Sequence, residues 1–292
     1  MDKKTKVPVS VIVVNWKTRD LTINALSALF ASTVLPEQII LVDNGSNDDT
    51  VVCVKEKFPQ VEIIANKENL GFAKANNQAI REKVNQPFIW LLNSDTETGK
   101  KSLEQLYNYI NQHGGVGAVG PQLVYPTRQF QSVGGFFPSI SNVFFYLIPV
   151  TFLLPKSIKK RLSSIALYPQ EIVGEGKKLD YVTGAASVIR RSALDKSGLL
   201  GEDYFMYFEE TDLCWRLQKN GWEILSINTD PVMHIYGGSF KTAFDKRRLR
   251  LFLESLKIFV KKNYVGYKKW IILIEIFLFG QLSLVVKKLK NL

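Results

Sequence analysis

The sequence has few of the residues that build disulfide frameworks or metal clusters. Its 292 residues include only two cysteines and two histidines. Cys53 and Cys214 show no metal-ligand spacing, so we interpret them as free thiols in a reducing compartment. Internal repeats and low-complexity segments are also lacking, so neither a repeat fold nor a disordered chain is expected. The 46% of hydrophobic residues suffices for a sizeable core in one large domain or two ordinary ones.

A signal peptide is not predicted either. The basic start of the chain is followed by an apolar run that is short, breaks at Asn15 and has no cleavage site. We therefore expect this run to be a core strand. No G-x-G-x-x-G follows that strand, where Asn15, Trp16 and Lys17 stand instead, and this weakens the hypothesis of a nicotinamide-dependent oxidoreductase.

The positive charge is concentrated at one end of the chain. The formal net charge is +11, and residues 241–292 contain 13 Lys or Arg against three acids, a net of +10. The first 240 residues therefore sum to about +1. This distribution argues against a nucleic-acid partner and favours a charged surface, such as an anionic membrane, as a partner of the tail.

Apolar strands and helical segments alternate in the first half, with short connections. Strands are expected over residues 9–15, 38–42, 61–65 and 88–92, and helices over residues 18–31, from about 48 to 58, and 72–84. Asn47 or Asp48 is expected to cap the second helix. This alternation predicts an α/β fold with a mostly parallel sheet covered on both faces.

The pattern loosens after a helix over 102–112 and a short strand over 117–119. The apolar stretch Val143–Leu154 is too short to span a bilayer, so it is either core or a loop lying on a membrane. The four basic residues in Lys156–Arg161 favour the membrane alternative. Regular elements return as a strand over 181–189, a helix that begins near the acids at 209–212, and a strand over 222–227.

Two helices are expected at the end of the chain. Residues 244–264 predict a basic amphipathic helix, and Trp270–Val286 is strongly apolar but contains Glu275 and Gln281. A spanning helix needs about 20 apolar residues, and a glutamate in its middle is costly. We therefore favour a helix in the plane of an anionic membrane. Packing on the body of the protein, or a contact in an oligomer such as a homodimer, is the alternative.

The stretch Trp90–Glu97 joins an apolar strand to a polar end. Asn93, Ser94 and Asp95 follow the strand directly, at the carboxyl edge of the predicted sheet, where open α/β sheets bind ligands. We interpret Asp95 as the holder of a divalent metal that carries a nucleotide diphosphate. A plain polar turn is the alternative, because these residue types favour turns.

A second cluster of acids begins a predicted helix. Glu209, Glu210 and Asp212 follow the aromatic run FMYF. Acids in a first helical turn are favoured by the helix dipole, but the aromatic run before them indicates an enclosed site. Further along, His234 precedes a Gly-Gly turn and is a candidate metal or phosphate ligand, whereas His113 is expected only to end a helix.

Together these segments resemble the family 2 glycosyltransferases of GT-A fold, in particular the rhamnosyltransferase-like branch that builds bacterial surface polysaccharides. The matching segments, in the order of the family, are VSVIVVNW, ILVDNGSNDDT, NKENLGFAKANNQAI, WLLNSDTE, YVTGAASVIRRSAL, EDYFMYFEETDLCWRLQKNGW and HIYGGS. The resemblance implies a Rossmann-like, mostly parallel mixed sheet flanked by helices. Residues 1–240 would form the catalytic domain, and residues 241–292 would associate with the membrane.

The resemblance also implies the residues of the site. Asp43 would contact the nucleotide base or ribose. Asp95 would be the last acid of the metal-binding DXD motif, in which Asn93 replaces the first acid, and His234 would help to hold the metal. The nucleotide-sugar site would comprise Asn15, Asp43, Asn44, Asn69, Gly71, Phe72, Asn76, Ser94 and Asp95.

Glu210 would act as the catalytic base, with Glu209 and Asp212 as rivals for that role. Small residues around Gly184 and Ala185, together with the rings of Tyr204 and Tyr207, would lie on the acceptor side. Mg²⁺ or Mn²⁺ would neutralise the leaving diphosphate while the base takes the proton of the attacking hydroxyl.

The expected activity is inverting transfer of a sugar, such as rhamnose, from a dTDP- or UDP-sugar to a lipid-linked saccharide. The enzyme would act peripherally at the cytoplasmic face of the plasma membrane. A non-catalytic sugar-nucleotide-binding protein remains an alternative at this point, and the oxidoreductase is the weaker one.

Overall fold

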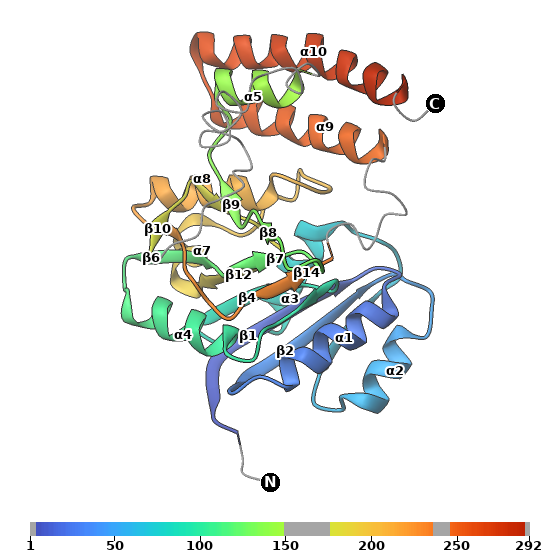
Figure 1. Ribbon diagram of the computed structural model, residues 1–292. Helices are drawn as coiled ribbons and strands as arrows, with labels where there is room; N and C mark the ends of the chain where they lie inside the picture. The colour runs from blue at the N-terminus through green and yellow to red at the C-terminus, as the bar shows by residue number, and fades with distance from the viewer. Residues whose placement is uncertain (1–3, 149–175, 236–245, 290–292) are drawn as a thin grey trace.

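A mixed sheet forms the centre of the computed structural model, which describes residues 4–148, 176–235 and 246–289 (Figure 1). Its strands in this part of the chain lie in the order β10-β13-β6-β12-β4-β1-β2-β3. They are β1 (Lys6–Asn15), β2 (Leu35–Asn44), β3 (Glu62–Asn66), β4 (Phe88–Asn93), β6 (Val116–Gly120), β10 (Lys177–Lys178), β12 (Ala186–Arg190) and β13 (Glu223–Ser226). Strands β1 to β4 pair in parallel, whereas β12 is antiparallel to both β4 and β6. The predicted α/β fold is confirmed.

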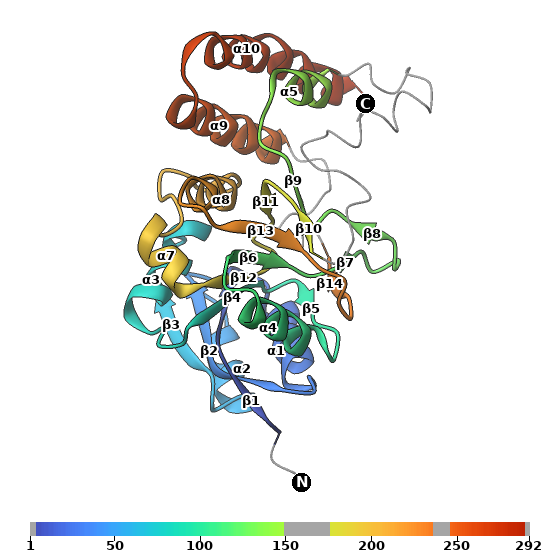
Figure 2. The same ribbon diagram turned by 90° about the vertical axis from the view of Figure 1, so that its left-hand side faces the viewer.

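Helices cover both faces of this sheet (Figures 1 and 2), which explains why its central strands carry apolar side chains on both sides. Val11, Ile12 and Val13 of β1 have no exposed surface, and neither does Trp90 of β4. The helices that cover the two faces are α1 (Arg19–Phe30), α2 (Thr50–Lys57), α3 (Phe72–Glu82), α4 (Ser102–Gln112), α7 (Arg191–Ser197) and α8 (Glu209–Lys219).

Of the two residues expected to cap α2, Asp48 does so, although it is not the N-cap residue itself. The N-cap residue of α2 is Asp49, one position after Asp48 and two after Asn47. The carboxylate of Asp49 does not cap the helix, because it pairs with Arg19 at 2.8 Å. Asp48 instead accepts the backbone N–H of Thr50 at 2.9 Å. The capping function thus falls to the residue before the N-cap position.

The strand expected over residues 181–189 is two strands. β11 (Tyr181–Val182) pairs with β9 (Gly134–Gly135), whereas β12 pairs with β4. The chain therefore changes sheets at residues 183–185, and periodicity alone could not reveal this change because apolar residues continue through it. The turn formed by residues 183–185 is called the crossover turn below.

A second, smaller sheet continues from the carboxyl end of β4. Its strand order is β5-β14-β7-β8, with β5 (Thr96–Glu97), β7 (Leu123–Val124), β8 (Phe130–Gln131) and β14 (Val232–His234). β5 follows β4 after two residues, and β14 is antiparallel to it with His234 opposite Thr96. This register carries a histidine from late in the chain to the polar end of β4.

Three helices form a separate layer beside the sheet (Figures 1 and 2): α5 (Ile140–Leu147), α9 (Lys246–Asn263) and α10 (Gly266–Leu289). The predicted helices near the end of the chain are confirmed. The apolar face of α9 is buried, since Leu256 and Phe259 have no exposed surface and Phe259 packs on the rings of Phe208 and Trp215. This face therefore contacts protein and is not available to a membrane.

Part of the apolar stretch over residues 143–154 is core. Val143 and Leu147 of α5 are buried against the other two helices of the layer. The rest of that stretch, the basic residues 156–161 and the Gly-Gly turn after His234 lie outside the described residues. Within those residues, no helix combines the length and apolarity needed to cross a bilayer.

A buried carboxylate joins α8 to the end of α9. Asp212 has no exposed surface, and it accepts hydrogen bonds from Arg216 Nε at 3.0 Å and Asn263 Nδ2 at 3.0 Å. The Tyr204 hydroxyl lies 3.3 Å and the Lys262 ammonium 3.4 Å from the same carboxylate. A buried charge with this many donors is a structural feature, because removing it would leave Arg216 without its carboxylate partner and Lys262 with Asp203 alone.

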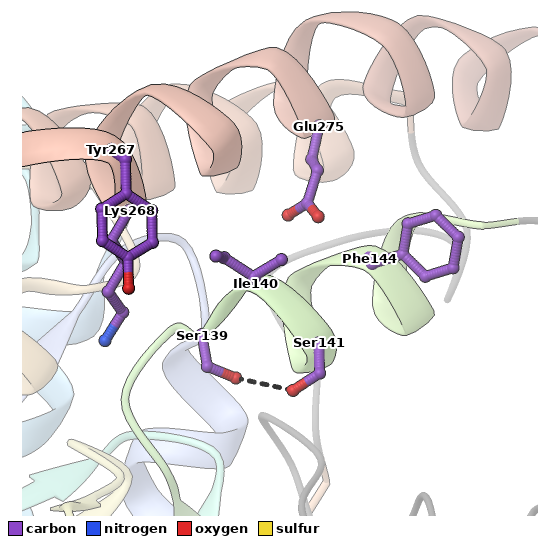
Figure 3. A pocket seen from close by; sticks show the side chains of 7 residues that line it. All are labelled: Ser139, Ile140, Ser141, Phe144, Tyr267, Lys268 and Glu275. Atoms are coloured by element: carbon purple, nitrogen blue, oxygen red, sulfur yellow. Dashed lines mark hydrogen bonds between the residues drawn. The ribbon is translucent and has the colours of Figure 1, made fainter.

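Glu275 lies at the interface between α10 and α5. It is only 7% exposed, its Oε2 has no hydrogen-bond partner, and it lines a pocket of about 530 Å³ with Ile140, Phe144 and Lys268 (Figure 3). Burial raises the pKa of Glu275 to about 7. The folded protein therefore holds a proton that the unfolded chain releases at lower pH.

This shift predicts that Glu275→Gln stabilises the protein at alkaline pH. Between the unfolded pKa of about 4.3 and the folded pKa, wild-type stability falls as pH rises, because the unfolded state binds fewer protons. We expect the variant to gain about 1–2 kcal/mol at pH 8 and to converge with wild type towards pH 4, the gain being limited by solvent in the pocket. Urea unfolding at both pH values measures this, with Glu254→Gln, an exposed glutamate of α9, as control. Lower stability of Glu275→Gln at pH 8 would contradict the account.

Candidate active site

The carboxyl ends of β1, β2 and β4 are joined by one chain of buried hydrogen bonds. Asn15 Nδ2 donates to Asp43 Oδ1 at 2.7 Å, and Asn15 Oδ1 accepts from the Thr18 hydroxyl at 2.7 Å. The Thr18 hydroxyl lies 2.9 Å from that of Ser94. Three predicted residues, Asn15, Asp43 and Ser94, are thus brought together. Thr18, which links them, was not anticipated, because a threonine at a helix start is common.

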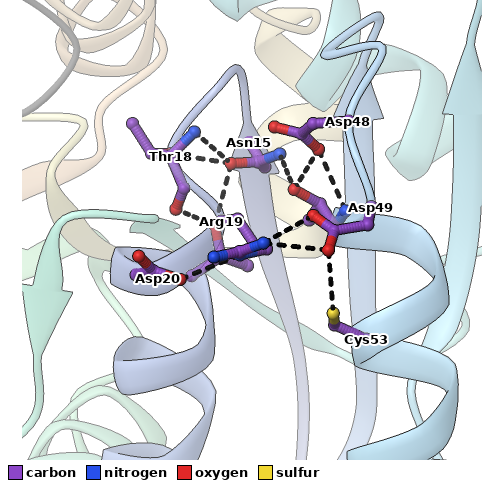
Figure 4. A network of polar contacts seen from close by, with 9 residues as sticks. Asn15, Thr18, Arg19, Asp20, Asp48, Asp49 and Cys53 are labelled. Carbon is purple, nitrogen blue, oxygen red and sulfur yellow. Dashed lines mark hydrogen bonds and ion pairs between the residues drawn. The ribbon is translucent and has the colours of Figure 1, made fainter.

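The outer edge of this network is an ion pair on the surface (Figure 4). Arg19 Nη1 lies 2.8 Å from Asp49, and Arg19 Nε lies 2.8 Å from Asp20. These bonds raise the pKa of Arg19, and the guanidinium lowers the pKa of the Asp49 carboxyl. Because the groups are solvated, the pair contributes little to stability, but it connects the starts of α1 and α2 beside the buried network.

Asn44 holds the loop that precedes α3. Its Nδ2 donates to Asn69 Oδ1 at 2.9 Å, and its Oδ1 accepts the backbone N–H of Leu70 at 3.1 Å. Gly71 follows with a φ of +86°, and a Cβ at this position would lie 2.9 Å from the carbonyl oxygen of Phe205. Glycine is therefore required where this loop meets the segment before α8.

The remaining residues predicted in α3 differ in accessibility. Phe72 is half-buried, and its backbone N–H faces the Phe205 carbonyl at 3.4 Å. Asn76 is 1% exposed and donates to the carbonyl of Phe72 at 2.9 Å. Asn76 therefore supports the start of α3 and does not present its amide to solvent.

Asp95 and His234 form a buried pair at the edge of the second sheet. Asp95 Oδ1 lies 3.2 Å from His234 Nε2, and the backbone N–H of Ile235 donates to the Asp95 carbonyl at 3.0 Å. On the other side of the ring, Nδ1 lies 2.9 Å from Gln131 Oε1. Gln131 was not anticipated, because it lies on the two-residue strand β8 in the part of the sequence that has no clear period.

The donor set of this pair fits a divalent cation. A neutral imidazole has only one N–H. The His234 ring lies between two oxygen acceptors, with Gln131 Oε1 beside Nδ1 and Asp95 Oδ1 beside Nε2. With the proton on Nδ1, the Nε2 lone pair and the carboxylate would both be available as ligands, and an imidazole with a carboxylate is a donor set that Mg²⁺ or Mn²⁺ accepts. The described residues contain no group of three or more His, Cys, Asp or Glu able to hold a metal.

The acids at the start of α8 follow a strained backbone. Tyr207 and Phe208 both have left-handed φ values, 70° and 68°, which is costly for aromatic residues and common at functional sites. Glu209 is 5% exposed with an Oε2 that has no partner, and burial followed by the charge of Glu210 raises its pKa well above the ordinary value. Burial also raises the pKa of Glu210, which is half-buried and accepts a bond from the Thr211 hydroxyl at 3.3 Å.

The crossover turn contacts the end of β4 and the start of α8. The backbone N–H of Asn93, at the end of β4, donates to the carbonyl of Ala185 at 2.9 Å. A Cβ on Gly184 would lie 3.1 Å from the Phe72 ring and 3.9 Å from the Cβ of Glu210. The end of β4, the start of α3 and the start of α8 therefore converge on this turn.

The predicted acceptor-side tyrosines are placed differently from the expectation. Tyr204 is 2% exposed and lies under α9, with its hydroxyl directed at Asp212 and its ring 5.6 Å from the Lys262 ammonium. The Tyr207 hydroxyl accepts from Arg248 Nε of α9 at 3.1 Å. Both rings thus contact the helical layer, because α9 covers the aromatic run, which the sequence pattern could not indicate.

Comparisons with known proteins agree with this arrangement. Residues 10–198 match the model of the family described as Glycosyl transferase family 2. An N-acetylglucosaminyl-diphospho-decaprenol L-rhamnosyltransferase of Mycobacterium tuberculosis is 28% identical over 72% of this chain and 70% of its own length. A low-salt glycan biosynthesis hexosyltransferase, Agl10, of Haloferax volcanii is 25% identical over 86% of this chain and 76% of its own.

Solved structures share the fold. A mannosyltransferase from Pyrobaculum calidifontis, in complex with GDP-Man and Mn²⁺, superposes with a TM-score of 0.60 at 15% identity, over 98% of this chain and 74% of that one. GalNAc-T7 with UDP, GalNAc and Mn²⁺ gives a TM-score of 0.58 at 15% identity, over 87% of this chain and 47% of that one. The family match covers more than half of the chain and excludes the oxidoreductase hypothesis. The chain belongs to glycosyl transferase family 2.

Proposed function

We propose that this glycosyltransferase is inverting and metal-dependent, and that it transfers a sugar from a nucleotide diphosphate to a hydroxyl of a lipid-linked saccharide. The observation that carries the proposal is that the crossover turn contacts both the end of β4, two residues before Asp95, and Glu210 at the start of α8. The Asp95–His234 pair has the ligands for a cation, and Glu210 is a carboxylate of raised pKa. An inverting transfer needs one of each.

The donor side is the buried network at the ends of β1 and β2. Asp43, held by Asn15 and by the Ser46 hydroxyl, would recognise the base or ribose, while Asn44 positions the loop that closes on the nucleotide. The solved neighbours were captured with GDP-Man or UDP and with Mn²⁺, which supports a nucleotide-sugar donor here. We propose a dTDP- or UDP-sugar as donor; the name of the mycobacterial relative supports rhamnose as the sugar, and the nucleotide rests on the family resemblance.

The acceptor and the place of reaction follow from the same relative, whose name describes a saccharide joined through a diphosphate to a polyprenol. We propose an acceptor of this class, used in the synthesis of a cell-surface polysaccharide. Such an acceptor lies in a membrane, and the family resemblance indicates peripheral action at the cytoplasmic face of the plasma membrane.

Asp95 and His234 would hold Mg²⁺ or Mn²⁺, and the ion supplies positive charge that stabilises the departing diphosphate. Glu210 would accept the proton of the acceptor hydroxyl as its oxygen bonds to the anomeric carbon and the bond to the diphosphate breaks. Attack opposite the leaving group inverts the configuration. A raised pKa suits this role, because it brings the base closer to the operating pH.

Glu210 is preferred to its two rivals on geometry. Burial, followed by the charge of Glu210, raises the pKa of Glu209 well above the ordinary value, which favours its protonated form and makes it the poorer proton acceptor. Asp212 is surrounded by donors from Tyr204, Arg216 and α9. Only Glu210 is both half-buried and adjacent to the crossover turn.

Replacing Asp95 by Asn is expected to abolish the metal-dependent part of donor binding. The substitution preserves the shape of the side chain and removes the charge that holds the ion. Binding of a nucleotide sugar stabilises the folded state by mass action, so thermal unfolding with and without Mn²⁺ measures the effect. Glu97→Gln, two residues along on β5, is the matched control and should respond to donor and Mn²⁺ as wild type does. A Mn²⁺-dependent shift of normal size in Asp95→Asn would overturn the metal assignment.

Replacing Glu210 by Gln is expected to preserve donor binding and to lower transfer by about 10²–10⁴-fold, the usual contribution of a general base. Glu209→Gln should retain most of the transfer activity. Asp212→Asn should lower the unfolding temperature instead, because it removes the buried charge that pairs with Arg216 and Lys262. If Glu210→Gln transferred sugar at nearly the wild-type rate, Glu210 would not be the catalytic base. A non-catalytic protein would bind donor without any transfer in the wild type.

A further inference from the structure

One face of α10 is apolar and exposed to solvent. Every exposed residue from position 270 to position 278 is a large hydrophobic one, and Trp270 and Phe277 are 64% and 72% exposed. Soluble surfaces rarely group apolar side chains in this way without a partner. The outer stripe, as this face is called below, comprises Trp270, Ile271, Ile274, Phe277 and Leu278.

The geometry of the helix separates the outer stripe from the packed face. At 3.6 residues per turn, the five side chains of the stripe fall within an arc of about 120°. Ile272 and Ile276 fall outside that arc and are buried against the other helices of the layer. Glu275 is directed towards α5 (Figure 3), so the only acid of α10 does not interrupt the stripe.

The stripe belongs to the outermost helix of the molecule. In both views α10 forms the end of the structure opposite the N-terminus, with α5 and α9 between it and the sheet (Figures 1 and 2). Nothing in the described part of the chain covers the stripe, since its five residues are all exposed there. α9 differs in this respect, because its apolar residues are already buried in the protein.

The charges around the stripe indicate an anionic partner. From residue 266 to residue 290 the sequence has five lysines, two before the stripe at 268 and 269 and three after it at 287, 288 and 290, and Glu275 as its only acid. Cations beside an inserted apolar face are attracted to anionic lipid headgroups. Pairing with a second copy is disfavoured, because a two-fold contact along the stripe would bring lysine-rich ends together in either orientation.

We infer that the outer stripe of α10 inserts into the surface of an anionic lipid bilayer, with α10 lying in the plane of the membrane. Spanning is not compatible with this packing, because one face of α10 contacts α5 and α9 and Glu275 lies within that interface. Docking would hold the enzyme beside a lipid-linked acceptor. Vesicle binding is measured without donor or acceptor, so it tests membrane binding by the outer stripe independently of the proposed catalysis.

The test is co-sedimentation of the full chain with vesicles of phosphatidylcholine containing about 30 mol % phosphatidylglycerol, against pure phosphatidylcholine. Wild type should bind the anionic vesicles, and the double variant Trp270→Ser/Phe277→Ser should bind about 10-fold more weakly or worse, because binding scales with buried apolar area. Val52→Ser removes an exposed apolar side chain from α2 and should not alter binding. Unchanged unfolding temperatures would show that the variants are folded.

A second measurement tests whether the Trp270 side chain enters the lipid acyl chains. Lipids brominated on their acyl chains should quench tryptophan fluorescence in wild type more strongly than in Trp270→Phe, which keeps the stripe apolar. Equal vesicle binding by wild type and the double variant would overturn the inference. So would equal quenching of wild type and Trp270→Phe, or light scattering that shows a wild-type dimer and a monomeric double variant.

Discussion

The buried hydrogen bonds at the carboxyl ends of β1, β2 and β4 are the constraint on which the rest of the site depends. Three strands that are apolar on both faces end together in Asn15, Asp43 and Ser94, and these side chains satisfy one another out of contact with water. Buried polar groups are costly unless they are paired, so the network determines one arrangement of the strand ends. The loops that follow the strands are positioned by this arrangement.

Much of the fold could be predicted from the sequence, because the first four strands and their helices have clear periodicity. The polar end of β4 predicted Asp95, and the family resemblance implied Asn15 and Asp43. Contacts between distant segments could not be predicted in this way. Gln131 beside His234, the crossover turn, and the placement of Tyr204 under α9 all depend on pairings between short strands or on helix packing, which leave no local signal.

The helical layer and the site are physically connected. Asp212 joins α8 to α9, and Ser255 of α9 donates to the carbonyl of Met206 at 2.8 Å, next to the two residues with left-handed backbone. These contacts hold the strained turn that positions Glu209 and Glu210. A layer that carries a membrane-docking face would therefore also support the proposed catalytic base, which explains why α9 buries its apolar side in the protein.

The central claim is that the Asp95–His234 pair binds the ion and that Glu210 faces the reacting carbon across the same cleft. It is tested most directly by a crystal structure with Mn²⁺ and a non-hydrolysable nucleotide sugar, using anomalous scattering to locate the metal. We predict a Mn²⁺ peak at about 2.1–2.3 Å from an Asp95 oxygen and from His234 Nε2, in contact with the diphosphate, with the Glu210 carboxylate facing the anomeric carbon from the side opposite the leaving group. A metal bound elsewhere, or Glu210 directed away from the sugar, would contradict the account.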